Sequence, residues 1–268
     1  MASSVQVIYV AGLATLAAVA SCVVAPSDGG SMAPDQRSGL EVNAGSAVAA
    51  DPPAPSILSA VLLHDEPDPG EERWRETGRD VVTLVFSVPL DPGGMQAQDF
   101  LVIGVDERQA LPARAVFAPS QESDELRAVT ITGAFGDAGV ASVNVIGALY
   151  DAEGRALDGA SSDVEPPSAK PRVVSWGPVK PGPGRCEGAA AAVRLWWSRP
   201  VRVRGTVGPD VTSRVAMVTA ADGSAIDVTG VDDLESADAA PDHVVDLCLA
   251  GADEVRSVST ATGAFTAG

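Results

Sequence analysis

The sequence predicts an all-β protein made of two tandem copies of one sandwich domain, placed after a signal peptide and a flexible tether. Three observations support this fold class. Only 4% of the 268 residues are aromatic and 20% are charged, whereas Gly (27) and Pro (20) are plentiful, which suits short strands and many turns. Apolar runs of strand length alternate with Gly, Pro, Asp and Ser clusters. An internal repeat is also present.

The amino-terminal segment has the pattern of an export signal. Residues 5–20, "VQVIYVAGLATLAAVA", form an apolar run that is short for a membrane span and suited to the hydrophobic region of a signal peptide. The following "VASC", Val19 to Cys22, resembles the bacterial lipobox, so residues 1–21 are expected to be removed and Cys22 lipidated. Because no Lys or Arg precedes the apolar run, ordinary signal cleavage nearby and an uncleaved anchor remain open alternatives.

Residues 22–53 are expected to form a flexible tether. They are poor in aromatic residues and have no apolar period. A flexible coil of this length has an end-to-end distance of roughly 30 Å, enough to hold a domain clear of a membrane surface.

The repeat divides the remainder of the chain into two copies. "VTLVFSVPL" (Val82–Leu90) matches "VRLWWSRPV" (Val193–Val201) at an offset of 111 residues. Three further matches lie in the same order at offsets near 116: 55–59 with 171–175, 123–134 with 241–252, and 140–149 with 255–265. Two domains, 54–163 and 171–268, are therefore predicted, joined by the stiff linker "DVEPPSAKP" (163–171).

Each copy is predicted to hold six or seven short strands, which is the pattern of an Ig-like sandwich. The strands expected in the first copy are 57–63, 81–88, 100–105, 113–118, 126–132 and 141–146. Those expected in the second are 172–176, 192–198, 214–219, 225–229, 243–249 and 254–260.

Residues 54–160 resemble the bacterial Ig-like domains of the SbsA type, which occur in surface-layer and secreted proteins. The resemblance is carried by "VTLVFSVPLDPGGMQAQDFLV" and "VNVIGALYDAEGRALDG", and the matching residues are Phe86, Ser87, Pro89, Asp91, Asp99, Phe100, Asp151, Gly154 and Leu157. The second copy keeps the first element and lacks the Asp-x-x-Gly hairpin. The resemblance implies a spacer, stalk, adhesive or carbohydrate-contacting module.

The cysteines agree with export. Once Cys22 is set aside, Cys186 and Cys248 remain as a single pair. The simplest prediction is that these two cysteines form a disulfide. Two unrelated buried thiols are the alternative. Neither cysteine has the spacing of a metal or redox motif.

Charge and motif content argue against several functions. A net charge of −18 repels nucleic acid and anionic lipid, so no nucleic-acid role is expected. No hydrolase, P-loop or dinucleotide motif is present, so no enzyme activity and no cofactor are expected, with a small hydrolase as a remote alternative. The two histidines, His64 and His243, lie at strand ends and are expected to be solvated.

Two candidate ligand sites remain. The run "VDDLESADAAPD" offers oxygen ligands for calcium from Asp232, Asp233, Glu235, Asp238 and Asp242, although a solvated loop is the preferred interpretation. The comparable acids of the first copy are Glu122, Asp124 and Glu125.

The strand around Val193 supplies the second candidate. Alternation places Trp197 in the core and sends Trp196 and Arg194 to the opposite face. There they are expected either to contact a sugar or partner, or to pack against a loop or the other domain. The leading hypothesis is a non-enzymatic lipoprotein of the bacterial cell envelope, membrane-anchored through Cys22, that contacts an unknown envelope protein or glycan. The alternative is a glycan- or calcium-binding surface module.

Overall fold

The computed structural model describes residues 54–63, 80–119, 125–182, 185–203, 216–232, 241–260 and 264–267. These residues form strands and one short 3-10 turn, η1 (Ala97–Asp99), which confirms the all-β class. No helix in these ranges is long and apolar enough to cross a membrane. The predicted signal peptide, Cys22 and the tether lie outside the described residues.

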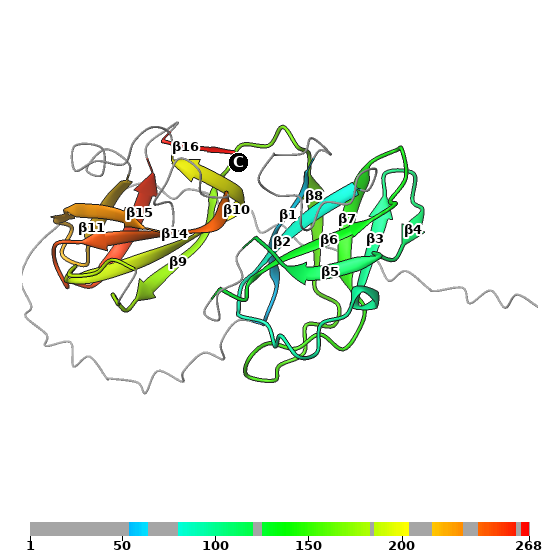
Figure 1. The fold of residues 1–268 in the computed structure, drawn as a ribbon, viewed down its shortest axis with the longest axis horizontal. Helices are drawn as coiled ribbons and strands as arrows, with labels where there is room; N and C mark the ends of the chain where they lie inside the picture. Colours follow the sequence, from blue (N-terminus) through cyan, green and yellow to red (C-terminus); the bar gives the residue numbers. More distant parts are fainter. Residues whose placement is uncertain are drawn as a thin grey trace, which may run out of the picture. The chain divides into compact units, whose positions relative to one another are not determined.

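The first half of the protein carries strands β1 to β8, coloured blue to green in Figure 1. Their order is β4-β3-β7-β8-β1-β2-β6-β5 in one curled sheet. Pairing is antiparallel except between β1 and β8, which run parallel. The strand bounds are β1 Ile57–Leu63, β2 Asp80–Phe86, β3 Phe100–Gly104, β4 Gln109–Ala110, β5 Arg114–Phe117, β6 Ala128–Gly133, β7 Val140–Val145 and β8 Ser161–Glu165.

The core of the first half lies between the two ends of this curled sheet. Leu84 and Phe86 of β2 pack in one cluster with Phe100 of β3 and Val143 of β7, and all four are fully buried. Alternate residues of each strand point to the same face, so the apolar side chains that the sequence places two apart meet in this interior.

The second half carries strands β9 to β16, in a five-stranded and a three-stranded sheet (Figure 1). The larger sheet has the order β13-β14-β10-β16 with β9 also paired to β10, and the smaller has the order β12-β11-β15. The bounds are β9 Val173–Val179, β10 Ala191–Val203, β11 Ala216–Ala220, β12 Ala225–Ile226, β13 Val228–Asp232, β14 Asp242–Leu249, β15 Val255–Thr260 and β16 Phe265–Ala267.

Equivalent strands follow the same order in both halves. The path β1-β2-β6-β5 corresponds to β9-β10-β14-β13, and β4-β3-β7 corresponds to β12-β11-β15. The register agrees as well, because Leu84 pairs with Ala60 and Val129, while Leu195 pairs with Trp176 and Val245. These pairs keep the offsets found in the sequence repeat, which therefore reflects a repeated strand order.

Three strands were not expected. The segment β8 runs into the residues predicted as the linker, because its backbone pairs with β1 on one side and β7 on the other. Its sequence, SSDVE, has no apolar run from which a strand could be predicted. The two-residue β4 and the terminal β16 are too short to be recognised from a pattern, and the strand expected at 225–229 is divided into β12 and β13.

The motif residues of the first half stabilise its turns. Asp151 is buried and accepts hydrogen bonds at Oδ1 from the backbone N–H groups of Glu153 and Arg155, and at Oδ2 from Arg155 Nε at 2.6 Å. These bonds lower the pKa of Asp151 in spite of its burial, which acts in the opposite direction. Gly154 has a φ of 79°, a backbone conformation that favours glycine. The Asp-x-x-Gly segment is thus a hydrogen-bonded turn.

The two halves are held together by the linker and by direct contacts. Arg199 of β10 donates from Nη1 to the carbonyl oxygens of Pro167 (2.5 Å) and Ala169 (2.9 Å), which ties the linker to the second half. Ser59 of β1 donates from Oγ to the carbonyl oxygen of Ser198 at 3.1 Å. Residues 52–268 accordingly form one compact unit.

Candidate functional site between the two halves

Trp196 is buried where the two halves meet. The register places it opposite Ser175 of β9 and Val244 of β14, on the face of β10 that points away from its own core. Only 4% of the residue is exposed, because it packs with Val244 and, from the first half, with Val85 and Ala128. Of the two expectations for Trp196, the structure therefore shows packing against the other half. Trp197 lies in the core of the second half, as predicted.

Arg194 belongs to a group of five charged residues that we call the charged cluster: Glu125, Arg127, Arg185, Arg194 and Asp246. Arg194 and Asp246 lie directly opposite each other on β10 and β14 and form a two-pronged ion pair, with Nε–Oδ1 and Nη2–Oδ2 both at 2.8 Å. Both residues are buried. Arg194 is thus engaged in an ion pair within the protein.

Glu125 brings the first half into the charged cluster. The residue is fully buried, and its Oε1 lies 2.6 Å from Arg185 Nη2 and 3.6 Å from Arg194 Nη2. Burial of a carboxylate is costly unless it is paired, and the two arginines of the second half supply the pairing. The expectation that this acidic loop is solvated is wrong for Glu125.

Arg127 is the third arginine of the charged cluster, and it lies over the ring of Trp196 with Cζ 5.4 Å from the ring centroid. Burial and, secondarily, the positive charge of Arg194 lower the pKa of its guanidinium, while Glu153 acts in the opposite direction. Within the described part of the chain, no hydrogen bond or ion pair takes up this guanidinium. The charged cluster holds three arginines and two carboxylates, and Arg127 is the arginine that neither carboxylate pairs with in the described part of the chain.

A cavity of about 280 Å³ opens beside Arg127, and we call it the inter-half pocket. The first half contributes Ser87, Pro89 and Arg127. The second half contributes the consecutive residues 175–179 together with Arg194 and Trp196.

His243 is buried, contrary to the expectation of a solvated strand end. Its Nδ1 lies 2.9 Å from the carbonyl oxygen of Trp197, and because a carbonyl only accepts, Nδ1 carries the hydrogen. Nε2 has no partner among the residues that the structure describes. Burial lowers the pKa of His243 to about 4. The hydrogen bond to Trp197 acts in the opposite direction, and the nearby positive charge of Arg199 lowers the pKa further. The imidazole is neutral at pH 7. His64 lies outside the described residues.

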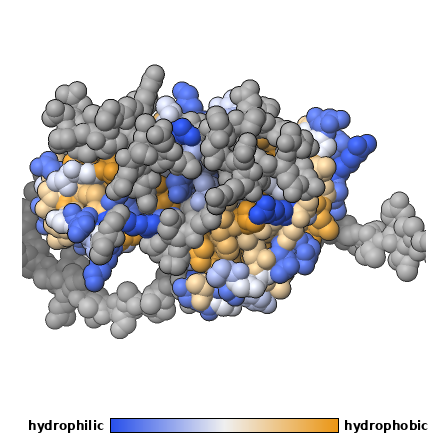
Figure 2. Space-filling model, in the orientation of Figure 1, coloured by the Kyte–Doolittle hydropathy of each residue, from blue (hydrophilic) through white to orange (hydrophobic). Residues whose placement is uncertain are grey.

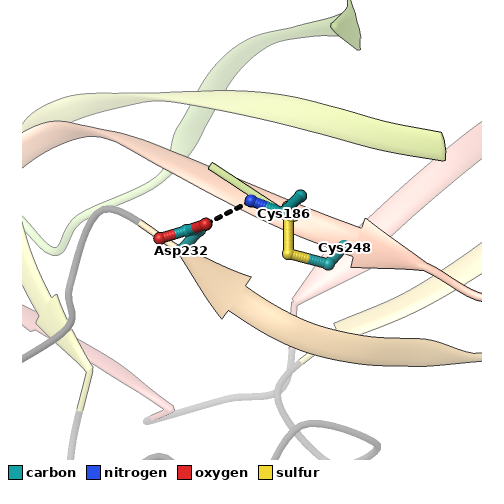
Figure 3. Close-up of side chains that lie close together, drawn as sticks. All are labelled: Cys186, Asp232 and Cys248. Atoms are coloured by element: carbon teal, nitrogen blue, oxygen red, sulfur yellow. Dashed lines mark hydrogen bonds between the residues drawn. A yellow bond between two sulfur atoms is a disulfide. The ribbon is translucent and has the colours of Figure 1, made fainter. Parts of the chain in front are cut away.

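Cys186 and Cys248 form the predicted disulfide, with their Cα atoms 5.1 Å apart (Figure 3). Asp232 lies beside it, and its carboxylate accepts a hydrogen bond from the backbone N–H of Cys186. The ligand atoms of these three residues lie within 4.8 Å of one another. Because each sulfur is bonded to the other, neither is a thiolate that can hold a metal ion, and Asp232 serves to fix the backbone at the disulfide.

The acids proposed as calcium ligands are not brought together in the described ranges. Asp232 is committed to Cys186, and Asp242 accepts from the backbone N–H of Val244 at 3.1 Å. Asp233, Glu235 and Asp238 lie outside the described residues.

The part of the surface that the structure describes carries no large continuous apolar patch. Figure 2 shows hydrophilic and hydrophobic residues interspersed over the described part of the face it presents. The large exposed apolar residues belong to different strands and loops, and such side chains are ordinary on protein surfaces. They are Val105, Leu111, Ile146, Tyr150, Trp176 and Met217.

Comparison with known proteins yields little. No family model and no curated protein matches the chain. Among solved structures, the chain is similar to the N-terminal part of the bacterial S-layer protein SbsC, with a TM-score of 0.30 and 13% identity, covering 80% of this chain and 44% of that one. The match thus spans less than half of the SbsC chain.

Proposed function

We propose that this protein is an exported, non-enzymatic module of the bacterial cell envelope, in which two Ig-like sandwiches pack as one body behind a lipid anchor at Cys22. The observation that carries the proposal is the disulfide between Cys186 and Cys248. Disulfides form and persist in oxidising compartments such as the periplasm and the cell surface. This agrees with the signal-like pattern of residues 5–22.

The strand order supports the Ig-like assignment. Lettered in chain order, β1, β2, β6 and β5 correspond to strands A, B, E and D, while β3, β7 and β8 correspond to C, F and G. An Ig-like domain places A, B, E and D in one sheet and C, F and G in the other. The second half repeats this order and differs at its end, since β16 pairs with residues 201–203 of β10.

The state of the buried charged groups supports a structural role. Glu125 and Asp246 are engaged by arginines, and Asp151 is engaged by its own turn. A catalytic carboxylate must instead face a substrate at a distance suited to proton transfer or attack. These groups join the two halves and stabilise turns, which suits a stalk or an interaction module.

Fractionation tests export and anchoring. The full-length protein, expressed in a bacterium, is expected in the membrane fraction with Cys186 and Cys248 protected from alkylation until a reductant is added. The variant Cys22→Ser is expected in the soluble exported fraction, because it lacks the sulfur that accepts the lipid.

The variant Ser21→Ala is the matched control, since it leaves Cys22 in place and is expected to remain in the membrane fraction. Membrane retention of Cys22→Ser would argue for an uncleaved helix in place of a lipid. A cytoplasmic protein with freely alkylated cysteines would overturn the export proposal as a whole.

A further inference from the structure

We propose that the inter-half pocket binds a small hydroxylated carboxylate, the chemistry of a sugar acid, and that Arg127 pairs with the carboxylate. This ligand site goes beyond the structural role proposed above and does not depend on export or anchoring. The charge, the polar groups, the size and the open face of the pocket all suit such a ligand.

The charge of the pocket selects an anion. Arg185 and Arg194 are committed to Glu125 and Asp246 by ion pairs of 2.6 and 2.8 Å, while Arg127 contacts the ring of Trp196. Arg127 lines the pocket, and in a chain with a net charge of −18 it provides a local positive centre. A guanidinium matches a carboxylate geometrically, since it offers two parallel donors.

The position of Arg127 is fixed by the backbone. The backbone N–H of Arg127 donates to the carbonyl oxygen of Glu125 at 2.6 Å. The carbonyl oxygen of Arg127 accepts from the backbone N–H of Phe86 at 2.9 Å. The guanidinium is therefore attached to a part of the chain that is bonded to β2 and to the charged cluster. The contact between the guanidinium and the ring of Trp196 restricts the side chain further, so less freedom is lost when an anion binds.

Hydroxyl and apolar groups surround the charge. Ser87 Oγ accepts from the backbone N–H of Ser56 at 2.9 Å, which leaves its hydroxyl hydrogen to donate to a ligand. Ser175 lies opposite Trp196 on the same face of the sheet and adds a second hydroxyl. Pro89 and Val179 form an apolar part of the pocket wall. Hydroxyl groups, a carboxylate and an apolar ring face occur together in a sugar acid.

The size of the pocket indicates a single ring. Pockets for drug-sized ligands range over roughly 300–1,000 Å³. The inter-half pocket, at about 280 Å³, falls just below this range and suits one six-membered ring with its substituents.

Gly177 keeps the pocket open. It lies opposite Arg194 in the sheet register, so that a side chain at this position would project from the face that carries Arg194. A Cβ added to Gly177 would meet no atom within 4 Å. A large side chain at residue 177 is therefore expected to fill the pocket without displacing the charged cluster.

The experiment titrates the purified protein with glucuronate, glucose, acetate and inorganic phosphate at low ionic strength, with backbone amide chemical shifts as the readout. Glucuronate is expected to bind with an affinity in the millimolar range and to shift the amides of residues 175–179. Glucose and acetate, which each lack one part of the ligand, and phosphate are expected to bind about tenfold more weakly or worse.

The variants test the assigned residues. Arg127→Gln is expected to weaken glucuronate binding by about tenfold or more, because a hydrogen bond to a charged group is lost. Arg127→Lys is expected to bind more tightly than Arg127→Gln, and Gly177→Phe is expected to block binding. Arg256→Gln, at an exposed arginine of β15, is the matched control and is expected to bind as the unmodified protein does.

Several results would overturn the proposal. The first such result is that glucuronate shows no saturable binding up to about 20 mM. This concentration would also detect a binding free energy weaker than about −4 kcal/mol, which corresponds to a Kd above about 1 mM. Equal affinity for acetate, phosphate or glucose is another. Full affinity in Arg127→Gln or in Gly177→Phe, each with an unchanged thermal midpoint, would place any binding elsewhere.

Discussion

Glu125 and Arg185 form an ion pair of 2.6 Å that joins the first half of the protein to the second across 60 positions of sequence. The carboxylate is fully buried, and Arg194 approaches the same oxygen to 3.6 Å. The pair connects the segment before β6 with the segment before β10. The contact between the two halves therefore includes a buried ion pair.

Glu125→Gln is expected to destabilise the protein by about 3–5 kcal/mol, because it leaves buried arginine charge without its carboxylate. Urea unfolding of residues 54–268 at pH 7 measures this. Glu153→Gln, at an exposed carboxylate, is the control and is expected to change the free energy of unfolding by less than about 0.5 kcal/mol. Equal stability of the two variants would show that the Glu125 pair contributes nothing.

Trp196→Ala is expected to cost about 3–5 kcal/mol, because it leaves a cavity between Val85, Ala128 and Val244. The matched variant is Trp176→Ala on β9, where the residue is 36% exposed and a smaller loss is expected. Thermal unfolding followed by circular dichroism compares them. A larger loss in the Trp176 variant would contradict the burial described for Trp196.

Stability is expected to fall as the pH is lowered from about 6.5 to about 4. The folded-state pKa of His243 is lowered to about 4, so in this window the unfolded chain binds a proton that the folded protein does not. The stabilisation is complete above pH 6.5, reaches about 3 kcal/mol, and is lost as the pH approaches 4.

The variant His243→Gln isolates this contribution from the carboxylates. The difference in unfolding free energy between the two proteins, measured at pH 7 and at pH 4.5, is expected to change with pH. The same difference at both values would mean that His243 does not titrate between them.

Gly147→Ala is expected to destabilise the protein by about 1–3 kcal/mol through overpacking. An added Cβ would lie 2.1 Å from Asp99 Oδ1 and 2.7 Å from Asp99 Cα, so backbone must shift. Asp99 cannot move freely, because its carbonyl oxygen accepts from the backbone N–H of Ile146 at 2.8 Å. Gly177→Ala, with open space at its Cβ, is the control, and denaturant midpoints decide between them.

The sequence by itself determined most of the strands, the repeat and the disulfide. Each follows from a local or periodic signal: alternation of apolar residues along β2 and β10, a recurring segment at a fixed offset, and a single remaining pair of cysteines. These signals work because a strand has a period of two and because a repeated strand order leaves a repeated pattern. The segment β8 was missed because its pairing, not its composition, makes it a strand.

The tertiary structure alone decided the site between the two halves. Alternation assigns Trp196 to the outward face of β10, and it does not say that another sheet lies against that face. Glu125 and His243 look like solvated loop or strand-end residues in the sequence, and burial gives each a different role. Burial of a polar group depends on which distant segments meet there, and that information is absent from the local pattern of residues.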